Sequence, residues 1–373
     1  MSVLAGARLV TADGIVDGWL EVDGRTIAAF GPGEPPRPAD RDLGGQWVVP
    51  GFVDIHVHGG ARAAYMSGDQ DEAVVVADLH RRHGTTTTVA SLVTGEASAL
   101  TTAIASLVEL VDDGLLAGVH LEGPFLAAAR CGAHDPSLLR APEPALVETL
   151  LAAGRGTVRM VTLAPELPQA VDAVHRVVGA GAIAAVGHTD ATYAETRAAL
   201  DAGATVATHL FNAMRPLHHR EPGPIPALLE DGGVMAELIC DGVHVHPAVV
   251  RTAIAAAGAG RIALVTDAMA ATGAGDGDYL LGGMAVRVDD GVARLVEGGA
   301  IAGSTLTMDR AFRFVVEAGV AVEDAVLMAS TTPATLLGLA DRVGSIAVGL
   351  DADLVILDGS FDRQAVMARG GWL

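Results

Sequence analysis

Two histidines in the stretch VDIHVHGG, His56 and His58, lie one residue apart at the end of an apolar run. On a β-strand, side chains two positions apart share a face, so both imidazole rings point in one direction. Such a pair can bind a divalent cation through its ring nitrogens. A single histidine at a strand end is more often a hydrogen-bonded structural residue, so the pair alone leaves both interpretations open.

Further ligand-type side chains end other short apolar runs. Taken one at a time, each has an ordinary structural explanation; a strand-end aspartate, for example, most often caps the following helix. Imidazole and carboxylate are, however, the ligands that a borderline cation such as Zn²⁺ or Fe²⁺ accepts. These side chains are Glu122 in HLEGPF, His188 in VGHTD, His209 in THLFNAM, His244 and His246 in DGVHVH, and Asp267 in VTDAM.

Eight apolar stretches alternate with Ala-rich helical segments such as DEAVVVADLHRRHG. Eight β/α units predict an α/β fold of the (β/α)8 TIM-barrel type. A doubly wound open sheet is the alternative, but the count of eight favours a closed barrel. The predicted strands are VDIHV, TTTTVA, GVHLEG, VRMVTLA, IAAVGH, TVATHL, VMAELIC and IALVTD.

Both ends of the chain have a different character. The segment WLEVDGRTIAAFGPG places a DG turn between two short apolar runs, which predicts a hairpin, and VGSIAVGLDADLVILDG near the C-terminus is similar. We therefore expect a small β-sandwich domain from residues 1–50 plus 345–373 and a catalytic barrel from residues 51–344. A Gly-rich excursion at residues 273–299 predicts a loop and hairpin inserted after the eighth strand.

The chemistry of a TIM barrel takes place at the C-terminal ends of its strands. Five strands end in His, Glu or Asp at one rim and the seventh runs on into His244 and His246, which together predict a metal site. A bound metal lowers the pKa of its water from 15.7 to about 7. Asp267, on the last strand, is the candidate for the general base that takes the water's proton and passes it to a leaving group.

The absence of lysine narrows the mechanism further, because all 24 Lys+Arg residues are arginine. A P-loop lysine, a Schiff-base lysine and a carboxylated metal-bridging lysine are therefore excluded. If two cations bind, the bridging ligand must be a carboxylate, and Glu122 is the one available.

The net charge of −21 argues against a nucleic-acid partner, although a few local cations could still meet a small anionic substrate. No apolar run is long enough to span a membrane, so no membrane association is expected. The N-terminus lacks the features of a signal peptide, and two cysteines give no disulfide framework. These features predict a cytoplasmic protein.

In these motifs the sequence resembles the amidohydrolase superfamily, and within it the N-acetylglucosamine-6-phosphate deacetylases, over essentially the whole chain. HxH alone is a weak signal, whereas LEGPF followed by GHT, HLFNAM and DGxH is specific to the deacetylases. The segments that carry the resemblance are PGFVDIHVHG, HLEGPF, GAHDP, VGHTDA, THLFNAM, HHREPG, DGVHV, VTDAM and AGST.

The resemblance implies metal-dependent hydrolysis of the acetamide of N-acetylglucosamine 6-phosphate to glucosamine 6-phosphate and acetate. It implies that Glu122, His188 and His209 bind the principal metal and that Asp267 is general base and then acid. His134 should polarise the acetyl carbonyl. The substrate residues that it implies are Ala133, Asn212, Ala213, Arg220, Asp241, His244, Ala302, Gly303 and Ser304.

Members of that family are commonly homodimers whose phosphate contacts come partly from the neighbouring subunit, which we expect here for Arg220. Some members lack the HxH histidines and carry one metal, whereas this chain keeps His56 and His58. We therefore hypothesise one or two cations, Zn²⁺ or Fe²⁺. His56, His58, Glu122 and Asp267 would surround one, and Glu122, His188 and His209 the other.

Other enzymes and other roles remain as alternatives. Another lysine-independent amidohydrolase, acting on a different N-acyl sugar or amide, fits the same residues. An inactive amidohydrolase-like scaffold predicts a broken ligand set or a lost Asp267, neither of which is seen, and no GxSxG elbow supports a serine hydrolase.

The two cysteines and four further histidines complete the expectations. Cys131, beside the GAH motif, is either an ordinary loop residue or a thiol that regulates loop closure. Cys240 is expected to be buried and inert, and His120 to be an interior structural histidine. The histidines expected on helices and exposed to solvent are His80, His83 and His175.

Overall fold

The computed structural model describes all residues from 1 to 373 and divides into two compact units. The first unit contains Met1–Asp54, His80–Thr87 and Thr307–Leu373. The second contains Ile55–Leu79 and Thr88–Leu306. The first unit is thus larger than the terminal segments 1–50 and 345–373 that the sequence predicts for the β domain.

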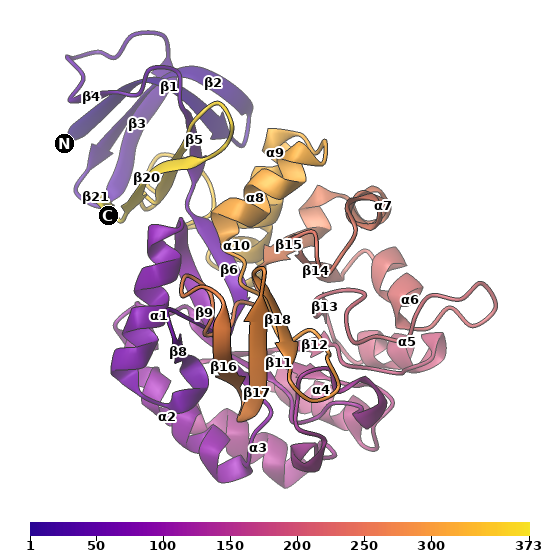
Figure 1. The fold of residues 1–373 in the computed structure, drawn as a ribbon. Coiled ribbons are helices and arrows are strands. Elements are labelled where there is room, and N and C mark those ends of the chain that lie inside the picture. The colour runs from indigo at the N-terminus through magenta and orange to yellow at the C-terminus, as the bar shows by residue number, and fades with distance from the viewer. The chain divides into compact units, whose positions relative to one another are not determined.

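Eight parallel strands form one sheet in chain order, which confirms all eight predicted strands (Figure 1). The last strand meets the first through a parallel bridge between Val57 and Ala268, so the barrel is nearly closed. The strands are β6 (Phe52–Val57), β9 (Thr85–Val93), β10 (Gly118–Glu122), β11 (Val158–Leu163), β12 (Ile183–Val186), β13 (Val206–Ala207), β14 (Met235–Ile239) and β15 (Ile262–Val265).

A helix follows each of these strands along the chain. The start of α5 shows how the sequence sets such a helix: Thr192 and Glu195 form a capping box, which ends the loop that follows His188. The helices are α1 (Gln70–Arg82), α2 (Ala97–Asp112), α3 (Pro144–Ala153), α4 (Ala170–Gly179), α5 (Tyr193–Asp201), α6 (Pro224–Glu230), α7 (Pro247–Ala257) and α8 (Met308–Glu317).

The excursion between β15 and α8 is a three-stranded antiparallel sheet, one strand more than the predicted hairpin. Its strands are β16 (Gly277–Leu281), β17 (Met284–Asp289) and β18 (Val292–Leu295). Minor elements of the second unit are β7 (Gly59–Gly60), β8 (Ala63–Ala64), η1 (Tyr65–Ser67), η2 (Ala128–Arg130), η3 (Pro136–Leu138) and η4 (Ala259–Arg261).

Strands from both ends of the chain pair in a second sheet, as the sequence predicts. The predicted DG turn joins β2 to β3, with Gly24 at φ +58° and Asp23 paired with Thr26. Side chains from both termini share one apolar core. The sheet order is β21 (Gly371–Trp372), β20 (Arg363–Ala368), β19 (Leu354–Leu357), β5 (Trp47–Pro50), β1 (Ser2–Thr11), β2 (Gly14–Asp23) and β3 (Thr26–Pro32), with β4 (Arg41–Asp42) on β1.

The remaining helical turns of the first unit are α9 (Val322–Val326), the π-helical turn η5 (Leu327–Thr331) and α10 (Thr332–Leu336). No helix combines the length and the apolar character that crossing a membrane requires.

Two of the three histidines that were expected on exposed helical faces contradict that expectation, and His83 lies just after the end of α1. His80 is fully buried, and His83 is half-buried because its ring packs against a carboxylate. Only His175 is exposed. His83 Nδ1 lies 3.0 Å from Asp309 Oδ2, and Arg363 Nε donates to the same oxygen at 3.1 Å.

Asp309 therefore joins three segments of the first unit. Burial opposes ionisation of its carboxyl, but the hydrogen bond and charge of His83, with bonds from Thr307 and Arg363, outweigh that effect and lower its pKa. A carboxyl with a lowered pKa stabilises the fold above its unfolded pKa of about 3.9, and this contribution is lost as the pH falls through the folded value.

We predict that Asp309→Asn lowers the free energy of unfolding by about 2 kcal/mol at pH 7, because Arg363 loses its counter-charge and the His83 ring loses its carboxylate partner. The gap between wild type and variant should shrink as the pH falls toward about 3. Denaturant unfolding at both pH values measures it, with the exposed Asp13→Asn as control. An Asp309→Asn deficit that is equal at both pH values would contradict the role of the charge.

Candidate metal centre and active site

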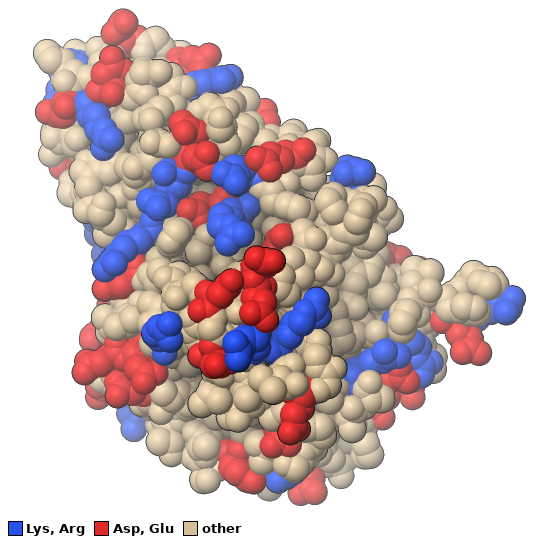
Figure 2. Space-filling model, in the orientation of Figure 1, with Lys and Arg blue, Asp and Glu red and all other residues tan.

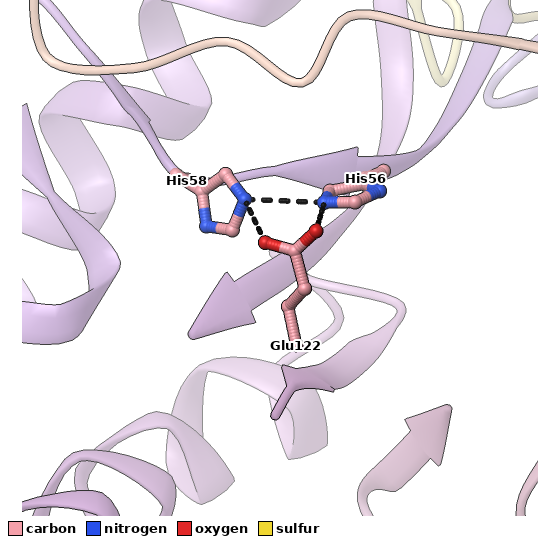
Figure 3. A group of neighbouring side chains, drawn as sticks. All are labelled: His56, His58 and Glu122. Atoms are coloured by element: carbon pink, nitrogen blue, oxygen red, sulfur yellow. Dashed lines mark hydrogen bonds and ion pairs between the residues drawn. The ribbon is translucent and has the colours of Figure 1, made fainter. Parts of the chain in front are cut away.

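The histidine pair at the end of β6, with His56 on the strand and His58 just after it, faces Glu122 at the end of β10. In Figure 3 the Glu122 carboxylate points between the two rings, with one oxygen toward each. His58 Nε2 lies 3.1 Å from Glu122 Oε2, His56 Nε2 lies 3.5 Å from Oε1, and the two Nε2 atoms are 3.1 Å apart. The HxH motif and the strand-end glutamate thus form one group.

A second group shares the same carboxylate. His188 Nε2 and His209 Nε2 lie 3.0 Å and 2.9 Å from Glu122 Oε1, and 3.0 Å from each other. All five side chains are buried. Glu122 therefore stands between two pairs of imidazoles, which is the arrangement that the bridging hypothesis requires.

The spacing of these atoms fits a cation. Adjacent ligands of a tetrahedral zinc ion with bonds of about 2.0–2.1 Å stand about 3.3 Å apart. The tautomers of the rings also suit metal binding. Three Nδ1 atoms face oxygens that can only accept a hydrogen bond, so each neutral ring carries its proton on Nδ1 and has its lone pair on Nε2, toward the site. These contacts are His56 to Glu237 Oε2 (3.0 Å), His58 to the Ser91 carbonyl (3.1 Å) and His188 to the Arg130 carbonyl (2.9 Å).

Asp267, just after β15, completes the first group. Its Oδ1 lies 3.1 Å from His58 Nε2 and 3.6 Å from His56 Nε2. Burial disfavours its ionised form, but His56 and His58 outweigh burial and lower the pKa of Asp267 to about 2. The carboxylate is therefore ionised at neutral pH and able to accept a proton.

The other pKa values show that the carboxylates favour positive charge at His58, whereas burial keeps His188 neutral. Burial disfavours ionised Glu122, yet the charge of His56 and a hydrogen bond from His134 hold its pKa well below the usual range. Burial lowers the pKa of His58, but Asp267 and Glu122 outweigh it and raise that pKa to about 9. Burial lowers the pKa of His188 to about 4. A divalent cation satisfies these carboxylates and leaves the imidazoles neutral.

Three of these side chains project from strained backbone. His188, His209 and Asp267 have φ values of +47°, +27° and +50°, in the left-handed region that non-glycine residues rarely adopt. Such conformations cost about 1–3 kcal/mol each and persist where their surroundings hold them. Here the Glu237 carboxylate accepts from the His209 N–H at 3.0 Å, and the Ser304 N–H donates to the Asp267 carbonyl at 2.7 Å.

His134 lies close to the second group but has the wrong tautomer for a metal ligand. Its Nε2 is 3.3 Å from Glu122 Oε2, within the range of a ligand group with His188. The Thr94 backbone N–H donates to its Nδ1 at 3.2 Å, so a neutral ring carries its proton on Nε2. His134 is therefore a hydrogen-bond donor directed into the site.

All of these ligand-type side chains except His56 line a cavity of about 350 Å³, a size typical of small-molecule sites. The inserted sheet contributes Leu281 from β16, and the segment after β18 contributes Ile301. With Val93 they give the cavity an apolar wall that the sequence did not reveal. The other lining residues are His58, Glu122, Ala129, Arg130, Gly132, Ala133, His134, His188, His209, Asn212, Ala213, His244, Asp267, Ala300 and Gly303.

Most of the predicted substrate residues lie at this cavity. Ala133, Asn212, Ala213 and His244 line it. Asp241 does not, but its Oδ2 lies 2.7 Å from His244 Nδ1, so it orients that ring and leaves Nε2 free. Their contact with a substrate stays a prediction.

The AGS turn divides into one residue at the cavity and two behind it. Gly303 lines the cavity, whereas Ala302 is fully buried in the core of the inserted sheet. The Ser304 hydroxyl donates to the Thr266 carbonyl at 2.5 Å and so faces away. The Ser304 N–H donates to the Asp267 carbonyl and so helps to hold Asp267, and a substrate contact by Ala302 or Ser304 stays a prediction.

Arg220 lies away from the cavity of its own chain. It is exposed in the segment between β13 and α6, which projects from the second unit (Figure 1). Figure 2 shows basic and acidic side chains together at the end of this segment. The cavity's own arginine, Arg130, is paired with Asp190 at 2.8 Å, so one chain offers phosphate no unpaired guanidinium there.

The structure also adds an ion-pair network beside His188. Asp190 binds Arg130 and, at 2.9 Å, Arg215, while Glu166 accepts from the Asp190 N–H. The Arg130 backbone carbonyl in turn accepts a hydrogen bond from His188 Nδ1. The network therefore fixes the loop that carries His134. The sequence offers no signal for it, since each of these residues resembles an ordinary surface charge.

Cys131, Cys240 and His120 complete the predicted set. Cys131 follows Arg130 with its side chain partly exposed and its thiol 4.0 Å from the Gly132 carbonyl, and its regulatory role stays a prediction. Cys240 is fully buried, as expected. His120 is buried between Ser91 and Thr162 hydroxyls, which confirms its interior position.

The barrel and the buried His, Glu and Asp group define the class of protein. Residues 47–373 match the Amidohydrolase family, so the chain belongs to that family of metal-dependent hydrolases. The resemblance seen in the motifs is thereby confirmed.

Individual relatives show to which kind of amidohydrolase the chain is similar. The chain is 38% identical to N-acetylgalactosamine-6-phosphate deacetylase of Escherichia coli O157:H7 over 99% of this chain and 98% of that protein. It is 34% identical to N-acetylglucosamine-6-phosphate deacetylase of Bacillus subtilis (strain 168), over 97% and 94%.

The solved structure of N-acetyl-D-glucosamine-6-phosphate deacetylase from Mycobacterium smegmatis is 48% identical, covers 100% of both chains and has a TM-score of 0.97. A mutant of that enzyme has been solved in complex with N-acetyl-D-glucosamine-6-phosphate.

Gly303 gives a test of how tightly Asp267 is held. It has φ +59°, and a Cβ there would lie 2.9 Å from the Asp267 carbonyl oxygen. We predict that Gly303→Ala lowers kcat by about 10- to 100-fold in a folded protein, because displacement of a reacting group by about 1 Å has that effect.

Gly298→Ala is the matched control for this variant. Gly298 has φ +79°, but a Cβ there meets nothing within 4 Å. Both variants therefore carry similar backbone strain, and only Gly303→Ala moves Asp267. Equal activity in the two variants, measured as acetate release alongside thermal unfolding, would contradict the proposed contact.

Proposed function

We propose that this chain hydrolyses the acetamide of N-acetylglucosamine 6-phosphate to glucosamine 6-phosphate and acetate, in amino-sugar metabolism. The observation that carries the proposal is Glu122 shared between two imidazole pairs, with ionised Asp267 at the same cavity. The full-length similarity to deacetylases of this kind supports it.

The chain's own residues divide the reaction between them. The Asp267 carboxylate accepts a proton from the attacking water and returns it to the amine nitrogen as the amide C–N bond breaks. His134 donates its Nε2–H to the acetyl oxygen, which gains negative charge as the carbonyl becomes tetrahedral. A divalent cation held by the ligand groups supplies Lewis acidity to this step. Acetate and the free amine are the products.

We propose two cation positions, filled by Zn²⁺ or Fe²⁺. His56, His58, Glu122 and Asp267 hold one, and Glu122, His188 and His209 hold the other. The two His56–His58 and His188–His209 spacings, 3.1 Å and 3.0 Å, are nearly equal, which supports comparable sites on both sides of Glu122.

N-acetylgalactosamine 6-phosphate is the second candidate substrate, because the relative that is 38% identical is named for it. The two sugars are epimers at C4, so the acetamide and phosphate that the reaction requires are common to both. Comparison of kcat/KM for the two sugars decides between them.

We propose a homodimer in which Arg220 of one subunit reaches the phosphate bound by the other. The projecting position of Arg220 and the pairing of Arg130 with Asp190 support this arrangement. Bidentate contact from a guanidinium is well suited to phosphate, and His244 Nε2 provides a further contact from within the chain.

The first prediction from this function concerns Asp267. Asp267→Asn should lower acetate release by at least about 10²-fold, because the proton acceptor is lost, while bound metal is retained through the remaining ligands. Acetate assays with metal analysis on the same sample measure both quantities, with the exposed Asp71→Asn as control. Absence of acetate release from folded, metal-loaded wild type would overturn the substrate.

The second prediction concerns the contact between Arg220 and the phosphate group of the substrate. Arg220→Met should raise KM for the phosphorylated sugar by roughly 10-fold or more and leave that for N-acetylglucosamine almost unchanged, since only a phosphate contact is lost. The exposed Arg155→Met serves as control.

A mixing experiment identifies the subunit that supplies it. Arg220→Met and Asp267→Asn chains, unfolded and refolded together, should regain activity at low substrate. In such a mixed dimer an Asp267→Asn subunit supplies arginine to an intact Asp267. Failure of the mixture to exceed its parents would place Arg220 in its own subunit.

A further inference from the structure

Glu237, in the middle of β14, is a fully buried carboxylate beside the metal centre. The reaction described above gives it no role. Its Oε2 lies 3.0 Å from His56 Nδ1 and accepts from the His209 backbone N–H, also at 3.0 Å. One oxygen thus holds His56 of β6 and His209, two residues after β13.

These two residues belong to different ligand groups. His56 lies on the side of Glu122 that faces His58, whereas His209 lies on the side that faces His188. The Glu237 backbone carbonyl also accepts from the Leu210 N–H at 2.9 Å. Glu237 therefore holds the turn at residues 209–210 at two points.

The two contacts of Glu237 Oε2 fix the tautomer of His56 and the backbone position of His209, and cation binding requires both. A carboxylate opposite Nδ1 keeps the proton of neutral His56 on that nitrogen, leaves the lone pair on Nε2 and increases its basicity. At His209 the backbone has φ +27°, and the carboxylate satisfies the N–H of this strained residue.

Stability of the fold does not explain this carboxylate. Glu237 Oε1 is buried and has no hydrogen-bond partner, and burial of a carboxylate that is incompletely hydrogen-bonded destabilises a fold. Its neighbours on β14, Leu238 and Ile239, are fully buried apolar side chains. A side chain of that kind at residue 237 would fill the space without this cost.

We propose that Glu237 is a positioning residue of the metal centre, which orients His56 and the turn of His209 so that their Nε2 atoms bind cations on either side of Glu122. The inference rests on the metal centre proposed above. It assigns to Glu237 control of cation affinity rather than contact with substrate.

The experiment compares wild type with Glu237→Gln, which keeps the size of the side chain but loses its charge. Metal-free protein is titrated with Zn²⁺ against a chromophoric chelator, and thermal unfolding of the same metal-free samples is followed. We expect Zn²⁺ affinity to fall by about 10- to 100-fold at one or both positions, as is typical when a group that orients a ligand is lost. The Tm of metal-free protein should change little.

Leu238→Ala is the matched control, since it perturbs the same strand on the face that does not contact the histidines. It should lower Tm and leave Zn²⁺ affinity within about twofold of wild type. Unchanged affinity in Glu237→Gln, with a lowered Tm like that of the control, would overturn the inference. If Glu237→Gln does not fold, Glu237→Asp is measured in its place with the same criteria.

Failure of the inference is distinguishable from failure of the proposed function. Wild type that binds no Zn²⁺ contradicts the metal centre itself. Wild type that binds Zn²⁺, alongside a Glu237→Gln variant that binds it equally well, contradicts only the role of Glu237.

Discussion

The Glu122 carboxylate is the interaction on which the site depends. It is buried and lies within about 3.5 Å of a ring nitrogen of each of five histidines, from several strands and one loop. An ionised carboxylate in such a position requires positive charge close by. The imidazoles can supply that charge as protons, but a divalent cation supplies it while leaving them neutral. The metal chemistry follows from this electrostatic requirement.

The parallel barrel places the groups that surround the Glu122 carboxylate. It brings the C-terminal ends of its strands to one rim, and the catalytic side chains then turn inward from strained, left-handed positions. Hydrogen bonds hold these strained residues in place, from the Glu237 carboxylate at His209 and from the AGS turn at Asp267. The same rim carries the inserted sheet, whose Leu281 covers the cavity with an apolar wall. Rigid strands therefore place the ligands, and loops enclose the substrate.

Much of this arrangement could be predicted from the sequence. Strand periodicity and motif order identified all eight barrel strands and the terminal sheet. They also singled out the side chains that meet around Glu122, because each stands where an apolar run ends, and the role of these side chains as metal ligands stays a prediction. Glu237 was missed because it lies inside such a run, MAELIC, and its partners are 181 and 28 residues away. His80 was misjudged because a histidine on an amphipathic helix gives no sign of the face it occupies. The wall formed by the inserted sheet depends on tertiary packing that local patterns do not encode.

The most direct test of the shared-carboxylate account is a crystal structure grown with excess Zn²⁺, with anomalous data collected at the zinc absorption edge. The account predicts two anomalous peaks, one among His56, His58, Glu122 and Asp267, the other among Glu122, His188 and His209, with Glu122 bound to both. A single peak that Glu122 does not contact, or no peak among these residues, would contradict it.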